Sequence, residues 1–248
     1  MIEDITCKKC KVNSYSVKVN GNKYCIKCAK LVIRREISRS IKVNQIHFIV
    51  LPKYKDWFEG YAKLLEEIVG SKVRITKLLL TDEEQGDLSS SFRSLIFHAN
   101  YLSKYILKDK VNLTLPFTAD IAFAMLIYAI SVKSYFLFRL LNNLDLGNLS
   151  IINPLIYYDR ETLESVGYKT SWELPNEISI FSKNVSKIMS ESQELSRSFI
   201  RSIDLLTPNN NFCVMCFYDV DSNNVCQKCS ILMNKAHEGE FKEISFLI

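Results

Sequence analysis

The segment HFIVLPKYKDWFEGYAKLLEEIVGSKVRITKLLL, residues 47–80, decides the fold class of this chain. Its first part, His47–Leu51, is a short apolar run with the length of a buried strand, and a proline ends it. Residues 56–69 then place apolar and aromatic side chains at helical spacing, and residues 73–80 form a second apolar run. Strand, helix and strand in this order predict two parallel strands joined by a helix.

The same alternation continues along the chain. Its further expected elements are a helix over residues 91–107, a third strand over 111–115, one long helix or two joined helices over 118–141, a helix from Asp159, and helices across the periodic stretch 180–203. This pattern predicts an α/β fold, a mainly parallel sheet covered by helices on both faces. Ligands of such folds bind at the carboxyl ends of the strands.

Eight cysteines flank this region in four CxxC pairs, and none lies between residues 28 and 213. The pairs are Cys7/Cys10, Cys25/Cys28, Cys213/Cys216 and Cys226/Cys229. Zinc prefers four tetrahedral sulfur ligands, and two residues between paired cysteines let one tight turn aim both sulfurs at the same ion. The sequence therefore predicts a structural zinc ribbon at each end of the chain, with one zinc ion in each.

Disulfides or redox-active CxxC pairs are the alternatives to zinc. The chain is long, shows no signal peptide and spaces its cysteines for metal, so we expect reduced thiolates and a cytoplasmic protein. Every cysteine has three partners, which leaves no thiol for nucleophilic catalysis. His237 could replace a ligand but is expected to be a bystander. The most apolar run, residues 121–132, is shorter than the roughly 20 residues needed to cross a bilayer, so no membrane partner is expected.

The positive charge is concentrated at the N-terminus. The chain has a net charge of +5, whereas its first sixty residues hold 13 Lys and Arg against 5 Asp and Glu, a net +8. A helix over residues 29–40 is expected to bury Leu31, Val32 and Ile37 and to turn a cationic face outward. The candidate RNA-binding residues are Lys8, Lys9, Lys11, Arg34, Arg35, Arg39 and Lys42. Such a patch binds phosphates without base specificity, and a solvated lysine-rich surface is the alternative.

The turn after the first strand lacks the features of a phosphate-binding loop. It reads Leu51-Pro52-Lys53-Tyr54-Lys55-Asp56 and contains no glycine, although phosphates must approach bare backbone amides in such a loop. We therefore expect no ATP binding. The alternative is an atypical anion pocket formed by Lys53, Lys55 and Asp56.

The order of these parts resembles the second subunit of the cytosolic tRNA 2-thiolation complex. The residues that carry the resemblance are the N-terminal ribbon with its basic helix, the segment Leu115-Pro116-x-Thr118-x-x-Ile121-Ala122 before a long helix, Pro154-Leu155 ahead of Glu164 and Tyr168, and the terminal Cys213-x-x-Cys216 and Cys226-x-x-Cys229. That family is similar to the N-type ATP pyrophosphatases. The resemblance implies an adenine-nucleotide alpha-hydrolase-like fold with a degenerate loop.

Active members of the wider family carry a Ser-Gly-Gly-x-Asp-Ser loop, against which only Asp56 can be placed here. Active thiolases also use cysteines inside the sheet domain, where this chain has none. The resemblance therefore implies a non-catalytic subunit that holds tRNA and pairs with a catalytic thiolase as a heterodimer. This chain is expected to have three parts, which are a ribbon and basic helix (1–42), a degenerate α/β domain (43–208) and a C-terminal ribbon (209–248).

Two other functions stay open from the sequence. One is an ATP-dependent tRNA-modifying enzyme with the atypical pocket described above. The other is a zinc-ribbon protein of transcription or translation, because ribbons occur widely in that machinery.

Overall fold

The central sheet has the mixed, mostly parallel topology that the alternating sequence pattern predicts. The computed structural model describes residues 6–12, 14–80, 86–191, 198, 202, 212–216, 218, 225–237 and 244–247. Within them, six strands pair in the order β6-β7-β5-β3-β4-β8. The strands are β3 (Gln45–Val50), β4 (Arg74–Leu80), β5 (Val111–Leu113), β6 (Leu144–Leu146), β7 (Leu149–Ile151) and β8 (Ile244–Leu247). The inner four are parallel, and β6 and β8 are antiparallel edge strands.

The three expected strands are confirmed, and three others were missed. β6 and β7 have three residues each and are joined by a tight turn in which Gly147 has a φ of +76°, so neither gives a recognisable apolar run. β8 comes from the end of the chain and pairs with β4. The segment 209–248, expected as a separate ribbon, therefore also contributes a strand to the central sheet.

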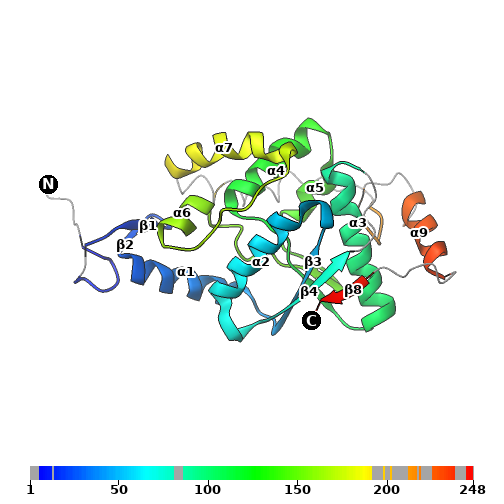
Figure 1. Cartoon of the computed structure of the whole chain (residues 1–248), viewed down its shortest axis with the longest axis horizontal. Helices are drawn as coiled ribbons and strands as arrows, with labels where there is room; N and C mark the ends of the chain where they lie inside the picture. Colours follow the sequence, from blue (N-terminus) through cyan, green and yellow to red (C-terminus); the bar gives the residue numbers. More distant parts are fainter. Residues whose placement is uncertain are drawn as a thin grey trace.

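Helices connect and cover the strands (Figure 1). They are α2 (Lys55–Val69), α3 (Leu88–Tyr101) with its π-helical continuation η3 (Leu102–Leu107), α4 (Ala119–Ser131), α5 (Tyr135–Leu140), α6 (Arg160–Ser165) and α7 (Asn176–Glu191). The short 3₁₀ turns η1 (Pro52–Tyr54) and η2 (Gly70–Lys72) flank α2. Because β4 and β5 lie on opposite sides of β3, crossovers of the usual right hand put α2 on one face of the sheet and α3 and α4 on the other. The expected helix over 118–141 is two helices, and residues 192–197, 199–201 and 203 of the stretch 180–203 lie outside the described residues.

The N-terminal ribbon consists of a hairpin and a long helix. Strands β1 (Val17–Val19) and β2 (Asn22–Tyr24) are antiparallel, and the turn between them has positive φ at Asn20 and Gly21, as a two-residue hairpin requires. The helix α1 (Ile26–Ser40) begins three residues earlier than expected.

The apolar face of α1 differs from the prediction. The helix buries Cys28, Ala29, Ile33 and Ile37, whereas Leu31 is 46% exposed. Leu31 lies about 160° around the helix from Ile33, because successive residues advance by roughly 100°. The prediction that Leu31 is part of the buried face was wrong.

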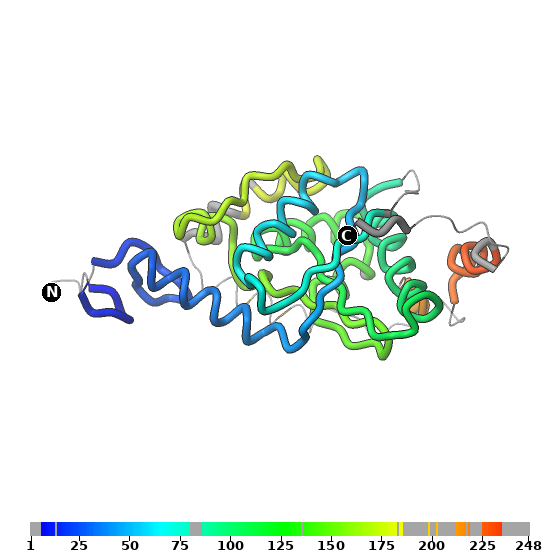
Figure 2. Tube along the Cα trace, turned by 60° about the horizontal axis from the view of Figure 1, so that its bottom comes forward, coloured from blue at the N-terminus to red at the C-terminus, as the bar shows by residue number. Residues whose placement is uncertain are grey.

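The two ribbons lie at opposite ends of the long axis of the molecule, with the N-terminal hairpin at one end and α9 (Gln227–His237) at the other (Figures 1 and 2). Among the described residues, no helix is both long and apolar enough to cross a bilayer.

Candidate functional site

The eight cysteines gather into two groups of four, each formed by two CxxC pairs. One group is Cys7, Cys10, Cys25 and Cys28, the other is Cys213, Cys216, Cys226 and Cys229, and within each group all sulfur atoms lie within 4.8 Å of one another. In both groups the second pair stands at the start of a helix, α1 or α9, so helix geometry fixes two of the four sulfurs. The pairing expected from the spacing is present.

The sulfur separations suit one tetrahedral metal ion. Sulfurs at about 2.3 Å from a central zinc ion are roughly 3.8 Å from one another. The Sγ atoms of Cys216 and Cys226 are 3.7 Å apart. A disulfide bond would place them at about 2.05 Å, and none of the eight cysteines is in a disulfide. The donor set therefore fits a metal ion in each group.

The thiols of the N-terminal group crowd one another. Burial alone would raise the pKa of Cys7, but backbone hydrogen bonds from Cys10, Cys25 and Lys9 lower it to about 6. Burial raises the pKa of Cys28 to about 12, and hydrogen bonds with the neighbouring thiols add to the rise. A readily ionised thiol, Cys7, therefore sits beside one that retains its proton, Cys28, and a cation that replaces that proton relieves this conflict.

The C-terminal group is packed against one face of α3. All four of its cysteines are buried. Arg93 donates a hydrogen bond from Nη2 to Cys226 Sγ at 3.0 Å, and Asn100 donates from Nδ2 to the carbonyl oxygen of Val214 at 2.8 Å. Phe97, buried between them on the same helix, packs against the cysteines. No sequence pattern marks this face of α3 as a partner of the cysteines.

All seven candidate RNA-binding residues are exposed. Lys8, Lys9, Lys11, Arg34, Arg35, Arg39 and Lys42 lie on the first cysteine turn, on α1 and directly after it. We call these seven residues the cationic strip, although they do not share one face; Figure 2 shows the backbone of the ribbon and α1 extending away from the sheet.

The cations of α1 do not all face the same way. Arg34 lies beside Gly70, the residue that caps the carboxyl end of α2. A Cβ atom added to Gly70 would lie only 2.6 Å from Nη2 of Arg34. Lys30, one turn earlier, donates from Nζ to the carbonyl oxygen of Gly167 at 3.4 Å. Cations at helix carboxyl ends are stabilising, so Lys30 and Arg34 help dock α1 on the α/β body. Arg35 and Arg39 lie on another side of α1, about 100–140° away from Arg34.

The carboxyl ends of the parallel strands are filled by aromatic side chains. Trp57 and Phe58 begin α2, Phe92 lies in the first two turns of α3, and Phe117 follows β5. These four side chains are fully buried. The ring centroid of Trp57 lies 5.4 Å from that of Phe58 and 6.1 Å from that of Phe92. Phe92 and Phe117 are 5.6 Å apart. In an α/β sheet a ligand would enter at this edge, and here four aromatic side chains of the core occupy part of it.

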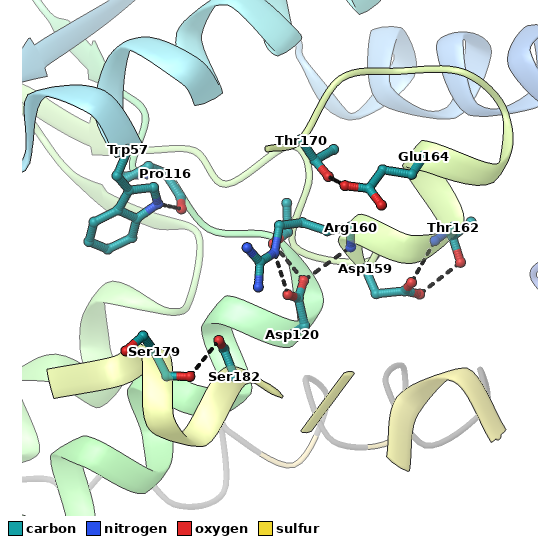
Figure 3. A network of polar contacts seen from close by, with 11 residues as sticks. Trp57, Pro116, Asp120, Asp159, Arg160, Thr162, Glu164, Thr170, Ser179 and Ser182 are labelled. Atoms are coloured by element: carbon teal, nitrogen blue, oxygen red, sulfur yellow. Dashed lines mark hydrogen bonds and ion pairs between the residues drawn. The ribbon is translucent and has the colours of Figure 1, made fainter. Parts of the chain in front are cut away.

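A hydrogen bond fixes this aromatic cluster. Trp57 donates from Nε1 to the carbonyl oxygen of Pro116 at 3.0 Å (Figure 3). Aromatic residues at the starts of two helices are a signal for such a cluster, but helical spacing alone indicated no more than a helix face for Trp57 and Phe58. Their convergence is a tertiary property.

The residues of the atypical anion pocket do lie together. Residues 53–57 and 173–177 line a pocket of about 430 Å³. However, Lys53 Nζ donates to the carbonyl oxygen of Gly86 at 2.8 Å, and Lys55 pairs with Glu59 at 3.7 Å. Asp56 Oδ2 accepts a hydrogen bond from the backbone N–H of Glu173 at 2.7 Å. All three side chains thus already have protein partners.

Two segments quoted above for the resemblance meet at a buried ion pair (Figure 3). Asp120 is fully buried, and its Oδ2 lies 2.7 Å from Nε of Arg160, which is 20% exposed. Oδ1 accepts from Thr118 Oγ1 at 2.7 Å and from the backbone N–H of Arg160 at 3.1 Å. These bonds join the start of α4 to the start of α6, a structural role.

Comparisons with known proteins find a match among solved structures. No family model matches the chain, and no curated protein matches it by sequence. The chain is similar to the U34-tRNA thiolase NcsA from Methanococcus maripaludis, solved with its [4Fe-4S] cluster, with a TM-score of 0.54 and 19% sequence identity. The match covers 94% of this chain and 97% of that chain. At this identity the likeness establishes the fold.

Proposed function

We propose that this chain is a non-catalytic, tRNA-binding and scaffolding subunit of a tRNA wobble-uridine 2-thiolation complex, in which it pairs with a catalytic thiolase. The observation that carries the proposal is the buried cluster of Trp57, Phe58, Phe92 and Phe117. The fold is similar to that of a tRNA thiolase over 94% of the chain, yet aromatic side chains occupy part of the strand ends where ligands of such a fold bind.

The turn after β3 supports the same conclusion. It forms the 3₁₀ turn η1, in which Pro52 has no N–H and the ring of Tyr54 is buried. An anion there would need bare amides, which this turn does not offer. The side chains of Lys53, Lys55 and Asp56 bind neighbouring protein groups, so ATP-dependent catalysis by this chain is not part of the proposal.

We assign tRNA binding to the cationic strip of the N-terminal ribbon and α1. Lys8, Lys9 and Lys11 on the ribbon and Arg35, Arg39 and Lys42 on and after α1 are exposed. Arg34 is exposed too, with the additional docking role at Gly70. Spaced cations along a 15-residue helix, about 22 Å long, can follow several successive phosphates of an RNA strand.

We assign zinc to both cysteine groups. The related thiolase carries a [4Fe-4S] cluster, but a cubane cluster distributes four thiolates over four irons and separates their sulfurs more widely than one ion does. Sulfurs within 4.8 Å of one another favour a single ion. Zinc here holds the ribbons folded and supplies no catalytic step.

We propose that the chain has three parts: a ribbon and basic helix (1–42), an α/β domain (43–208) and a C-terminal ribbon (209–248). The last strand of the third part, β8, pairs with the central sheet. The proposal also places the protein in the cytoplasm, where its thiolase partner and tRNA would be found.

The experiment is a pull-down of the tagged protein from its native host, followed by measurement of thiolated tRNA after deletion of its gene. We expect a catalytic thiolase among the bound proteins and loss of 2-thiouridine in the deletion strain. The purified chain alone should not thiolate tRNA. Thiolated nucleotide formed by the isolated chain, or unchanged thiolation in the deletion strain, would refute the proposal.

A further inference from the structure

Arg93 occupies a position between the C-terminal cysteine group and an aromatic ring. Its Nη2 lies 3.0 Å from Cys226 Sγ, and its guanidinium carbon lies 4.0 Å from the centroid of the Tyr218 ring. One face of the guanidinium is therefore covered by Tyr218 while an N–H is directed at a sulfur. A planar cation that stacks on a ring through one face and donates a hydrogen bond from one edge has little freedom to move away.

The charge of the site explains why a cation belongs there. Four thiolates around a divalent ion carry a net charge of −2, and all four cysteines of this group are buried. A buried charge is costly unless it is paired and hydrogen-bonded. The Arg93 guanidinium supplies a positive charge and an N–H donor at Cys226, and such charge-assisted bonds are stronger than neutral ones.

The rest of the α3 face holds the cysteine turn in place. Phe97 and Asn100 follow Arg93 at spacings of four and three residues, which keeps them on one side of α3, and Lys104 follows in η3. Asn100 binds the carbonyl of Val214, and Lys104 Nζ lies 3.7 Å from the sulfur of Met215. Residues 214 and 215 are the two residues between a pair of ligands, so α3 fixes the turn that presents those ligands.

The N-terminal group is less enclosed. Its Cys10 is partly exposed, whereas every cysteine of the C-terminal group is buried. A chelator in solution therefore reaches the first group more easily.

We propose that Arg93 is a positioning residue for the C-terminal metal centre, and that it retains the ion by binding Cys226 Sγ and closing the side of the site that faces α3. This inference rests on the proposed zinc binding. It makes the C-terminal centre the slowly exchanging one of the two, and it makes metal retention there depend on the folded α/β body.

The test is zinc release from the full-length, zinc-loaded protein to the chromogenic chelator 4-(2-pyridylazo)resorcinol. We expect two zinc ions per chain and two release phases. Cys7→Ser should remove the fast phase and Cys226→Ser the slow phase, which assigns them. Outer partners of metal ligands contribute about 10–100-fold to metal affinity, so Arg93→Gln should speed the slow phase at least about tenfold and leave the fast phase unchanged. The matched control is Arg74→Gln, an exposed arginine on β4, which should change neither phase.

The possible results distinguish the existence of the zinc centres from the role of Arg93. A protein that binds no zinc refutes the proposed centres themselves. Two bound zinc ions with an unchanged slow phase in Arg93→Gln overturn the role of Arg93 and leave the centres standing. Should Arg93→Gln fail to fold, Arg93→Lys and Tyr218→Leu take its place. Both should speed the slow phase several-fold, because Arg93→Lys removes the planar guanidinium and Tyr218→Leu removes the ring that covers it. Wild-type release rates in both variants would also overturn the inference.

Discussion

Replacement of Trp57 tests the aromatic cluster on which the proposed function depends. Its side chain is fully buried, packs against Phe58, Phe92 and Phe117, and donates a hydrogen bond to the carbonyl oxygen of Pro116. Loss of a buried Trp side chain to Ala typically costs about 3–5 kcal/mol. We therefore expect Trp57→Ala to lower the free energy of unfolding by that amount, which moves the urea midpoint by about 1–2.5 M for an m-value of roughly 2–3 kcal/mol/M.

The hydrogen bond can be separated from the packing with two matched substitutions. Trp57→Phe removes the donor and leaves the buried Pro116 carbonyl without it, at a cost of about 1–3 kcal/mol. The chain's other tryptophan, Trp172, is also buried, but its Nε1 has no hydrogen-bond partner among the described residues. Trp172→Phe loses ring volume and no hydrogen bond. We expect Trp57→Phe to be the more destabilising by about 1 kcal/mol or more.

The assays are urea unfolding of the zinc-loaded protein followed by far-UV circular dichroism, and isothermal titration of each variant with ATP and magnesium. None of the variants should bind ATP, because the turn after β3 lacks the bare amides that hold phosphates. Equal stability of the two Phe variants would contradict the structural role of the Trp57 hydrogen bond. ATP binding by Trp57→Ala would show that the aromatic cluster covers a competent nucleotide site, and it would refute the absence of such a site from this chain.

Three further predictions concern the RNA surface, the ion pair and the metal. The double substitution Arg35→Ala and Arg39→Ala should weaken tRNA binding and reduce the slope of log K against log salt by about 1–2, measured by filter binding at several salt concentrations. Arg34→Ala should in addition lower thermal stability, because Arg34 docks α1 at the end of α2. Asp120→Asn should cost about 3–5 kcal/mol in urea unfolding, because it breaks a buried ion pair, and a wild-type midpoint would contradict this. Cys28→Ser should reduce bound zinc from two ions per chain to one by mass spectrometry, and two remaining ions would exclude a four-thiolate site at that end.

Local patterns made a large part of the fold predictable. The apolar run over residues 47–51, the periodic helix over 56–69 and the run over 73–80 became β3, α2 and β4, with no boundary shifted by more than two residues. The two-residue spacing within each cysteine pair likewise indicated which sulfurs share a site. Both signals are short-range: a period or a spacing is set by the geometry of a few neighbouring residues.

Other features escaped the sequence because their cause is not local. β8 pairs with β4 across more than 160 residues of chain. Its four residues are too few to give a local pattern that identifies them as a strand of the central sheet. Arg34 and Arg35 are adjacent in sequence and were grouped as equivalent cations, yet the helix rotates one toward the end of α2 and leaves the other turned away from it.

The sequence by itself determined the alternation of strands and helices, the two four-cysteine groups and the concentration of positive charge at the N-terminus, since composition, period and spacing are properties of the chain before it folds. Only the tertiary structure decided that Trp57, Phe92 and Phe117 meet at the strand ends and that Arg93 reaches Cys226, 133 residues away. Such encounters depend on how the elements pack in three dimensions, because side chains distant in sequence come into contact only after the sheet has ordered its strands.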